Sequence, residues 1–359
     1  MAEFPDYQIM KNTITINNIK IGPGQPPYIV AELSANHLGD INRAREIIKQ
    51  AKSSGANAVK LQTYTADTLT IDHDGPGFKI EGGLWQGRTL YDLYQKAHTP
   101  WEWHQELFDL GKELGITIFS SPFDNTAVEF LETLNCPAYK IASFEILDLE
   151  LIKCAAQTGK PLIISTGLAN EEEISDAVKT AKYSGCSELI LLHCISAYPT
   201  PPDEYNLLTM VDLHKKHNLV VGISDHTLGV AVAIAGVGLG ASMVEKHITL
   251  WRDEGGPDAP FSLEPEELKI LTQQCRTAWE ALGEINYKNK QSESGNIIFR
   301  RSLYVVKDIN AGEEFTRENI RSIRPGFGLA PKYLPEILRR KAAGKISRGT
   351  PLDWSMIAP

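Results

Sequence analysis

The sequence lacks the features of a thiolate metal protein, a secreted protein, a membrane protein or a nucleic-acid-binding protein. Its five cysteines are far apart and form no C-x-x-C pair, which excludes a common thiolate metal site and is typical of a reducing compartment. No apolar run is long enough to cross a membrane, and the first residues do not resemble a signal peptide. The formal net charge is −9, so a nucleic-acid-binding surface is not expected. We therefore expect a cytoplasmic protein with no membrane or nucleic-acid partner.

A glycine-rich dinucleotide-binding turn is also missing after the first strand candidate, which argues against a doubly wound open sheet. The sequence instead alternates short β-branched segments with segments of 3.6-residue helical spacing. The strand candidates are 28–33, 58–63, 116–121, 138–143, 162–166, 189–194, 219–225 and 243–249. Eight such βα units, preceded by a predicted hairpin at 13–21, indicate an α/β protein with a (β/α)8 TIM barrel.

The C-terminal part has a different pattern. A polar run at 286–296 lacks apolar periodicity and predicts a linker. The following residues, 297–359, are punctuated by Gly and Pro and predict a small β-rich domain. Such a short segment seldom folds stably alone, so we expect it to dock on another barrel. The predicted organisation is a barrel domain at 1–285, the linker, and the small domain.

Polar side chains recur where the strand candidates end, which is where active sites of TIM barrels lie. They include Glu32, Lys60, Gln62, Ser121, Lys140, Ser143, Glu145, Ser165, Ser196, Tyr198, Ser224, Asp225, His226, Glu245, Lys246 and His247. Lys60 and Lys140 lie within apolar strands, where an unpaired charge is costly. Together with the hydroxyls they predict a phosphate and carboxylate site. The alternative is that both lysines form buried ion pairs with Glu32 or Glu245.

Two histidines end neighbouring strand candidates. The segment between His226 and His247 has room for one helix, so the two strands should be parallel and place both imidazoles at the same end. Such a pair is a candidate metal site, and hydrogen-bonded structural histidines are the alternative. One of Glu32, Asp225 and Glu245 is a candidate to orient a metal-bound histidine. Glu32 is also the candidate for acid–base or electrostatic work.

The segment from 65 to 100 is far longer than the usual connection between a strand and a helix of a barrel. We call it loop two. Its large apolar residues include Phe78, Leu84, Trp85 and Tyr94. Because loop two follows the second strand, it lies over the same rim as the lysines. The aromatics favour a substrate lid over a surface excursion. Asp258, between two prolines after the last strand, is expected at this rim as well.

Several short motifs along the chain, taken together, resemble those of one family. They are Ala31-Glu32 with Asn36-His37, Lys60-Leu-Gln62-Thr63, Tyr139-Lys140-Ile-Ala-Ser143, Ser165-Thr-Gly167, Tyr198-Pro199-Thr200, Gly222-Ile-Ser-Asp-His226 and Glu245-Lys-His247. Together they resemble the sialic acid synthase family, and the C-terminal part resembles its antifreeze-like (SAF) domain. The resemblance implies a transferase that condenses phosphoenolpyruvate with an N-acylated sugar to give a nine-carbon ulosonic acid and phosphate.

The resemblance also implies roles for individual residues. The positions that match phosphoenolpyruvate-binding residues are Lys60, Ser121, Lys140, Ser143, Ser165, Ser196 and Ser224. His226 and His247 match the ligands of a divalent metal ion (Mn²⁺ or Mg²⁺), and with Glu32 they are the implied catalytic residues. The positions that match sugar contacts are Gln62, Tyr198, Asp258 and Arg324, to which we add Trp85 of the predicted lid. A domain-swapped homodimer is implied, with Arg324 acting in the partner's site.

Within the family, four motifs favour one branch. They are Gly83-Leu-Trp85, Leu90-Tyr91-Asp-Leu-Tyr94, Thr99-Pro-Trp-Glu-Trp-His104 and Arg324-Pro-Gly-Phe-Gly-Leu329. They resemble members that use 2,4-diacetamido-2,4,6-trideoxy-L-altrose. Ser196 stands where N-acetylneuraminate-forming members have Asn, which argues against N-acetylmannosamine. The alternatives are a branch that forms N-acetylneuraminate or legionaminate and, from another class, an inactive carbohydrate-binding barrel.

Overall fold

The structure is a computed structural model that describes residues 13–82 and 85–359. Gly83 and Leu84 of the predicted lid lie outside the described residues, as do residues 1–12. The chain divides into two compact units, Met1–Gly283 and Glu284–Pro359, and each is described by itself.

The first unit begins with the predicted hairpin. Strands β1 (Ile14–Ile16) and β2 (Ile19–Ile21) pair in antiparallel fashion. Asn17 and Asn18 form the turn between them with φ angles of 46° and 65°. Both residues are thus left-handed, as a two-residue hairpin turn requires, and Asn tolerates this conformation better than most residues.

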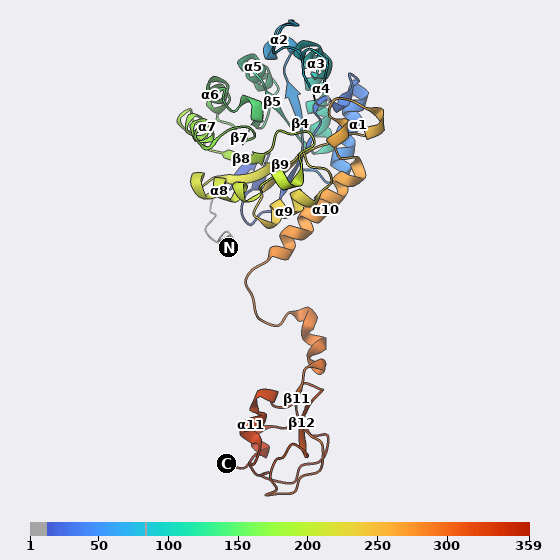
Figure 1. Ribbon diagram of the computed structural model, residues 1–359, viewed down its shortest axis with the longest axis vertical. Coiled ribbons are helices and arrows are strands. Elements are labelled where there is room, and N and C mark those ends of the chain that lie inside the picture. The colour runs from blue at the N-terminus through green and yellow to red at the C-terminus, as the bar shows by residue number, and fades with distance from the viewer. Residues whose placement is uncertain (1–12, 83–84) are drawn as a thin grey trace. The chain divides into compact units, whose positions relative to one another are not determined.

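Eight parallel strands then close into a barrel, with β10 pairing both β9 and β3 (Figure 1). The strands are β3 (Tyr28–Glu32), β4 (Ala58–Thr63), β5 (Thr117–Pro122), β6 (Tyr139–Ile141), β7 (Leu162–Ser165), β8 (Leu189–Cys194), β9 (Val220–Ser224) and β10 (Met243–His247). Each lies within one or two residues of a predicted strand, except that β6 is shorter. The TIM barrel expected from the alternating pattern is confirmed.

Helices surround the strands of this barrel (Figure 1). The α-helices are α1 (Ile41–Ser53), α2 (Ala66–Leu69), α3 (Leu90–Ala97), α4 (Trp101–Leu114), α5 (Asn125–Thr133), α6 (Leu149–Gln157), α7 (Glu171–Tyr183), α8 (Leu208–His217), α9 (Ala231–Gly238) and α10 (Pro265–Leu282). Short 3-10 turns are η1 (Ser34–His37), η2 (Ser143–Glu145), η3 (Pro202–Glu204), η4 (Arg252–Glu254) and η5 (Ala259–Phe261). Helices α2 and α3 both lie within loop two, where the sequence pattern predicts only a lid.

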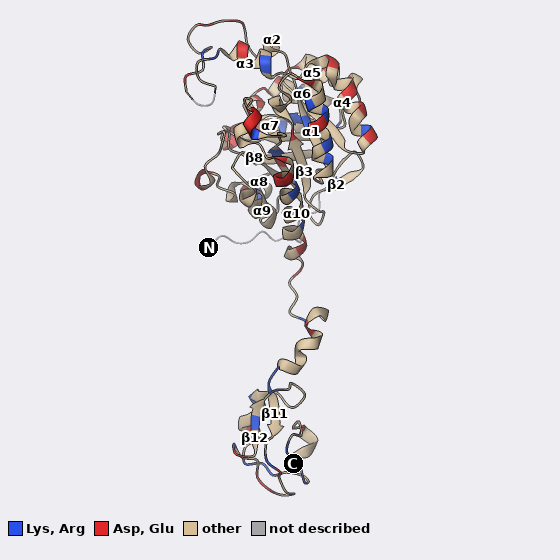
Figure 2. Cartoon of the chain, turned by 90° about the vertical axis from the view of Figure 1, so that its right-hand side faces the viewer, with Lys and Arg blue, Asp and Glu red and all other residues tan. Residues whose placement is uncertain are grey.

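Helix α1 illustrates how the outer helices form. The Asp40 carboxylate accepts the backbone N–H of Asn42 and so caps the first turn. The buried residues Ala44, Ile47, Ile48 and Ala51 recur at helical spacing and face the barrel. Lys and Arg (blue) and Asp and Glu (red) lie along α1 and α4 in Figure 2. The apolar core between strands and helices fixes the strand ends, and therefore the side chains at the barrel mouth.

The second unit is small and has a hydrophobic core of its own. Its antiparallel strands are β11 (Ser302–Val305) and β12 (Ile320–Ile323), with helix α11 (Leu334–Ile337) and the 3-10 turns η6 (Gln291–Phe299), η7 (Pro331–Tyr333) and η8 (Trp354–Met356). This agrees with the expected β-rich C-terminal domain. In the described part of the chain, we find no helix with the length and apolar character needed to cross a membrane.

Candidate active site

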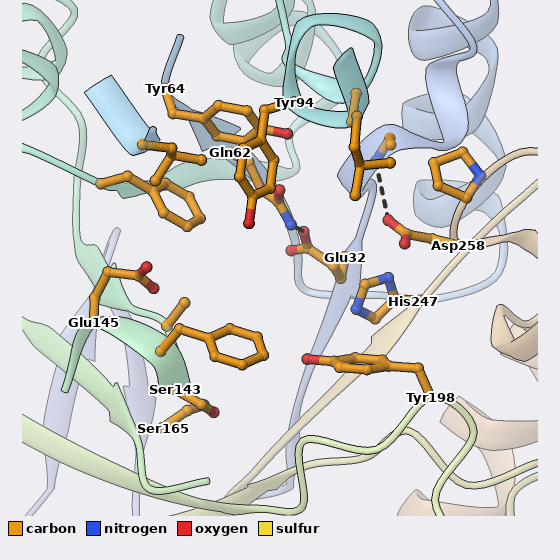
Figure 3. A pocket seen from close by; sticks show the side chains of 18 of the residues that line it. Glu32, Gln62, Tyr64, Tyr94, Ser143, Glu145, Ser165, Tyr198, His247 and Asp258 are labelled. Carbon is orange, nitrogen blue, oxygen red and sulfur yellow. Dashed lines mark hydrogen bonds between the residues drawn. The ribbon is translucent and has the colours of Figure 1, made fainter. Parts of the chain in front are cut away.

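The C-terminal ends of the barrel strands surround a cavity of about 400 Å³ (Figure 3). Most of the side chains predicted from sequence line it. They are Glu32, Lys60, Gln62, Trp85, Lys140, Ser143, Ser165, Tyr198, Ser224, His226, His247 and Asp258. The fold therefore brings residues from all parts of the barrel sequence into one site.

Three of the implied substrate contacts, Ser121, Ser196 and Arg324, are not among the residues that line the cavity. Ser121 is buried on β5. The Ser196 and Ser143 hydroxyls lie close to Gly167, in the loop after β7. A Cβ added at Gly167 would be 2.4 Å from the Ser196 Oγ and 2.8 Å from the Ser143 Oγ. Arg324 belongs to the second unit, where its guanidinium carbon lies 5.9 Å from the centre of the Phe299 ring. Its place in the site stays a prediction.

The two predicted lysines meet at one carboxylate. The Nζ atoms of Lys60 and Lys140 lie 2.8 and 3.5 Å from the Oε1 atom of Glu245, and Lys60 is also 3.3 Å from the Oε2 atom of Glu32. Both lysines are buried, and these contacts are the ion pairs that the alternative interpretation expects. Burial outweighs the attraction of Glu245 at Lys140 and lowers its pKa to about 8. At Lys60 the two glutamates outweigh burial and raise the pKa.

Several buried oxygens at this end of the barrel lack a hydrogen-bond partner among the described residues. They include the hydroxyls of Ser121, Ser165 and Ser196 and one oxygen each of Glu145 and Glu245. Buried polar groups are normally satisfied, so hydroxyls without partners need an explanation. Serine hydroxyls that can donate, at the same end of the barrel as the two lysine ammonium groups, are suited to an anion with several acceptor oxygens.

Glu32 lies at the end of β3, among the side chains that line the cavity (Figure 3). Burial raises its pKa to about 7, although Lys60 opposes the shift. The Gln62 amide donates to its Oε1 atom at 2.8 Å and fixes the orientation of the carboxylate. A carboxylate with a pKa near neutrality can both accept and release a proton at physiological pH.

The two histidines face each other across the ends of β9 and β10, with ring centres 5.3 Å apart. The His226 Nδ1 is 3.1 Å from the carbonyl oxygen of Ile195, which can only accept a hydrogen bond. The His247 Nδ1 is 3.2 Å from the Ser34 hydroxyl. These bonds occupy one nitrogen of each ring and leave the Nε2 atoms for a ligand.

This pair fits a divalent ion. Burial holds the pKa of His247 well below its usual range and favours the neutral imidazole that a metal ligand needs, whereas at His226 the neighbouring Cys194 outweighs burial and raises the pKa. Within residues 13–82 and 85–359, no group of three or more His, Cys, Asp or Glu side chains is arranged to hold a metal ion. The described part of the chain would thus provide two imidazoles, one protein ligand fewer than a typical catalytic zinc site, and leave the other positions to water or substrate.

Loop two covers the mouth of the barrel. Residues 78–80 of loop two pair with residues 87–90, because the Ile80 N–H donates to the Arg88 carbonyl oxygen and the Leu90 N–H donates to the Phe78 carbonyl oxygen. The Trp85 indole N–H donates to the carbonyl oxygen of Pro257 at 3.1 Å, and its ring centre is 6.0 Å from that of Tyr198. Loop two is therefore attached to the segment after β10 and lies close to Tyr198 after β8, as a lid over the mouth would.

The structure adds two aromatic residues, Tyr64 and Phe123, that the sequence reasoning did not assign to the site. Tyr64 and Phe123 each follow directly after a strand, and their ring centres are 5.0 Å apart. Tyr94, whose ring centre is 5.9 Å from that of Tyr64, extends this apolar wall. Glu145, which the sequence pattern placed with the polar residues at the strand ends, also lines the cavity, and burial raises its pKa to about 7. Position at a strand end was the signal that could have identified Tyr64 and Phe123.

Asp225 and Lys246 correct one expectation. The sequence pattern grouped them with the polar residues of the mouth, but neither lines the cavity. They form an ion pair with each other on the outer side of the barrel, where Glu267 and Cys275 of α10 influence Lys246. The reason is strand alternation: Ser224 and Glu245 point inward, so the next residue of each strand points outward.

A TIM barrel with paired lysines, donor hydroxyls, a near-neutral carboxylate and two histidines at one mouth defines an enzyme for an anionic substrate. Comparison with known proteins agrees. The NeuB family model matches residues 47–287, and the SAF domain model matches residues 300–358. The chain belongs to the NeuB family, which confirms the resemblance to the sialic acid synthase family.

Individual relatives match most of the chain. A pseudaminic acid synthase of Helicobacter pylori is 47% identical over 330 residues, which are 92% of this chain and 97% of that protein. An N,N'-diacetyllegionaminic acid synthase of Legionella pneumophila is 37% identical over 95% of this chain and 98% of its own length. The crystal structure of an N-acetylneuraminic acid synthetase of Leptospira borgpetersenii with citrate is 32% identical, with a TM-score of 0.72, and covers 80% of this chain and 96% of that one.

Proposed function

We propose that this protein condenses phosphoenolpyruvate with 2,4-diacetamido-2,4,6-trideoxy-L-altrose to give pseudaminic acid and phosphate. The single observation that best supports the proposal is the pair of buried lysines beside serine hydroxyls that have no partner among the described residues. The relatives named as pseudaminic acid synthases, at 44–47% identity, support this choice of sugar.

The lysines and serines hold phosphoenolpyruvate in this proposal. Its phosphate and carboxylate oxygens accept hydrogen bonds from Ser121, Ser165 and Ser196, and the ammonium groups of Lys60 and Lys140 balance its charge. Glu245 keeps both lysines in place before the ligand binds. The anion then enters a site whose donors are already oriented, which reduces the entropic cost of binding.

His226 and His247 would hold the divalent ion, Mn²⁺ or Mg²⁺. When bound, such an ion acts as a Lewis acid that polarises a carbonyl oxygen, here the aldehyde oxygen of the open-chain sugar. The hydrogen bonds of both Nδ1 atoms orient the rings for that purpose.

Glu32 serves the carbon chemistry. C3 of phosphoenolpyruvate bonds to the aldehyde carbon, which leaves a cationic centre at C2. Water adds to C2, and phosphate departs as its C–O bond breaks. The Glu32 carboxylate stabilises the cation and takes the proton of the attacking water. Its pKa near 7 suits this exchange, and the Gln62 amide keeps its second oxygen oriented.

The apolar wall favours a deoxy sugar. In Figure 3, Tyr64 and Tyr94 lie on one side of Glu32, and His247 and Tyr198 lie on the other. A sugar whose aldehyde end lies beside His247 therefore extends its C6 end toward the tyrosines. A methyl group buried there contributes about 0.8 kcal/mol, whereas a hydroxyl would lose hydrogen bonds to water at a cost of about 1–3 kcal/mol.

We also propose a homodimer in which the second unit of one chain completes the site of the other. The motivation is a small C-terminal unit after a polar segment, together with the resemblance to the sialic acid synthase family. Arg324 of the partner subunit would then reach an N-acetyl oxygen or a carboxylate of the substrate. The described cysteines are all free, which favours the cytoplasm as the location.

The test is a reaction of the purified protein with Mn²⁺, phosphoenolpyruvate and the diacetamido altro sugar. We expect phosphate release that depends on the sugar and a product whose mass equals that of pseudaminic acid. Phosphoenolpyruvate labelled with ¹⁸O at its bridging oxygen should give labelled phosphate, because the C–O bond breaks. Absence of condensation with this sugar, combined with activity on N-acetylmannosamine or on the gluco-configured diacetamido sugar, would assign the protein to another branch.

A further inference from the structure

The two chain segments that end in the histidines lie side by side, so that each residue of one has a counterpart in the other. β9 runs into Ser-Asp-His and β10 ends in Glu-Lys-His, with Glu245 in register with Ser224. Inside the barrel, the Ser224 hydroxyl donates to the Oε1 atom of Glu245 at 3.0 Å. The next inward pair is His226 and His247, with ring centres 5.3 Å apart. The middle residue of each triplet faces the outer side of the barrel.

These middle residues, Asp225 and Lys246, form an ion pair behind the site. The Lys246 Nζ is 2.9 Å from the Asp225 Oδ2, and both side chains are at most 1% exposed. The same ammonium donates to the backbone carbonyl of Thr227 at 2.6 Å. The Asp225 Oδ1 accepts the N–H of Thr227 at 2.9 Å. Lys246 therefore holds both chain neighbours of His226 and is itself the neighbour of His247.

This connection is important because His226 lies beyond the end of β9. The register of β9 with β10 ends at Ser224 and Glu245, followed by a bond from the Asp225 N–H to the Glu245 carbonyl. The His226 carbonyl accepts from Thr200, which belongs to the loop after β8 and not to β10. In the described residues, the Lys246 side chain thus ties the backbone around His226 to the strand that presents His247.

We infer that Asp225 and Lys246 are a positioning pair: they set the separation of the two imidazoles and so determine the affinity for the divalent ion. This inference rests on the metal site of the proposed function. The competing interpretation is a buried ion pair that contributes only to stability. The two interpretations differ in what they predict when both residues are replaced. Replacing both members of a buried ion pair is often neutral for folding, so stability alone should change little. A histidine that is displaced in the same variant should still weaken metal binding.

The decisive variant is the double substitution Asp225→Asn with Lys246→Met. It leaves no unpaired buried charge, and Asn keeps an acceptor for the Thr227 N–H. We expect a melting temperature close to that of the wild type and a Kd for Mn²⁺ that is about 10- to 100-fold higher. Binding is measured without substrates, from the electron paramagnetic resonance signal of free Mn²⁺ during a titration. Lys246→Arg keeps the donor and should retain most of the affinity.

A matched control is Lys160→Met, which removes a lysine that pairs with Glu132 just before β7. It should leave the Kd unchanged. A folded double variant with the wild-type Kd overturns the positioning role and leaves the proposed function intact. A wild-type protein that binds no Mn²⁺ overturns the metal site and this inference together. If the double variant does not fold, Asp225→Asn alone decides: a Kd raised several-fold supports the inference, and an unchanged Kd refutes it.

Discussion

Replacing Lys140 by Met should weaken phosphoenolpyruvate binding selectively. The Lys140 Nζ is 3.5 Å from the Oε1 atom of Glu245, which also pairs with Lys60 at 2.8 Å. Removal of Lys140 therefore leaves no buried carboxylate without a partner, and the barrel should stay folded. What is lost is one of the two positive charges at the end of the barrel where three serine hydroxyls have no partner among the described residues.

The size of the effect follows from this geometry. A hydrogen bond to a charged group contributes about 1.5–3 kcal/mol, and a charge pair about 4 Å apart at an effective dielectric constant of 20 contributes about 4 kcal/mol. The KM for phosphoenolpyruvate should thus rise about 10- to 1000-fold. The KM for the sugar should change little, because the apolar wall and the sugar contacts are intact.

The pH profile gives a second measure of Lys140. Burial lowers its pKa to about 8, so the free enzyme loses this charge as the pH rises through 8. The value of kcat/KM for phosphoenolpyruvate reports the free enzyme and should fall above that pH. Lys140→Met should remove this basic limb, and Lys160→Met should not. An unchanged KM for phosphoenolpyruvate, or an equal rise of both KM values in a folded variant, would refute the assignment of the anion site.

Three further predictions concern the other groups of the site. Burial raises the pKa of Glu32 to about 7, and its carboxylate form is required, so activity should fall as the pH drops through 7. Gln62→Leu removes a hydrogen bond that stabilises the carboxylate and should move this acidic limb to higher pH. A pH–rate profile checks both expectations. His226→Ala and His247→Ala should each abolish condensation without lowering the melting temperature substantially. Chelation should remove the wild-type activity, and added Mn²⁺ should restore it. Full turnover of metal-free enzyme would contradict this prediction. Mixing Arg324→Ala with Glu32→Ala chains should regenerate one intact site per heterodimer, and heterodimers without any recovered activity would exclude action in trans.

Sequence periodicity was sufficient for the barrel and for most of the site. β-Branched segments alternate with helical segments, so each strand and its C-terminal end could be located, and TIM barrels place their chemistry at those ends. Glu32, Lys60, Lys140, His226 and His247 meet in one cavity for this reason. The sequence did not determine which groups pair with the two lysines. Both an anion site and buried ion pairs were consistent with the sequence, and the structure contains the ion pairs.

The remaining features depend on packing that sequence spacing does not encode. Loop two contains the helices α2 and α3, which pack over the rim and add Tyr94 to the apolar wall. The shift of the Glu145 pKa results from burial, which only the folded structure reveals. The outward direction of Asp225 and Lys246, in contrast, was available from strand alternation once Ser224 and Glu245 were placed inside the barrel.

A competition between sugars tests the central claim most directly. The enzyme receives limiting phosphoenolpyruvate, Mn²⁺ and equal concentrations of 2,4-diacetamido-2,4,6-trideoxy-L-altrose and N-acetylmannosamine, and the ratio of the two products is read by mass spectrometry. This ratio equals the ratio of the kcat/KM values. From the cost of about 1–3 kcal/mol for a hydroxyl against the apolar wall, we predict a preference for the deoxy sugar of roughly tenfold to hundredfold. A ratio of one or below would contradict the proposed activity, although the condensation chemistry of the site would stand.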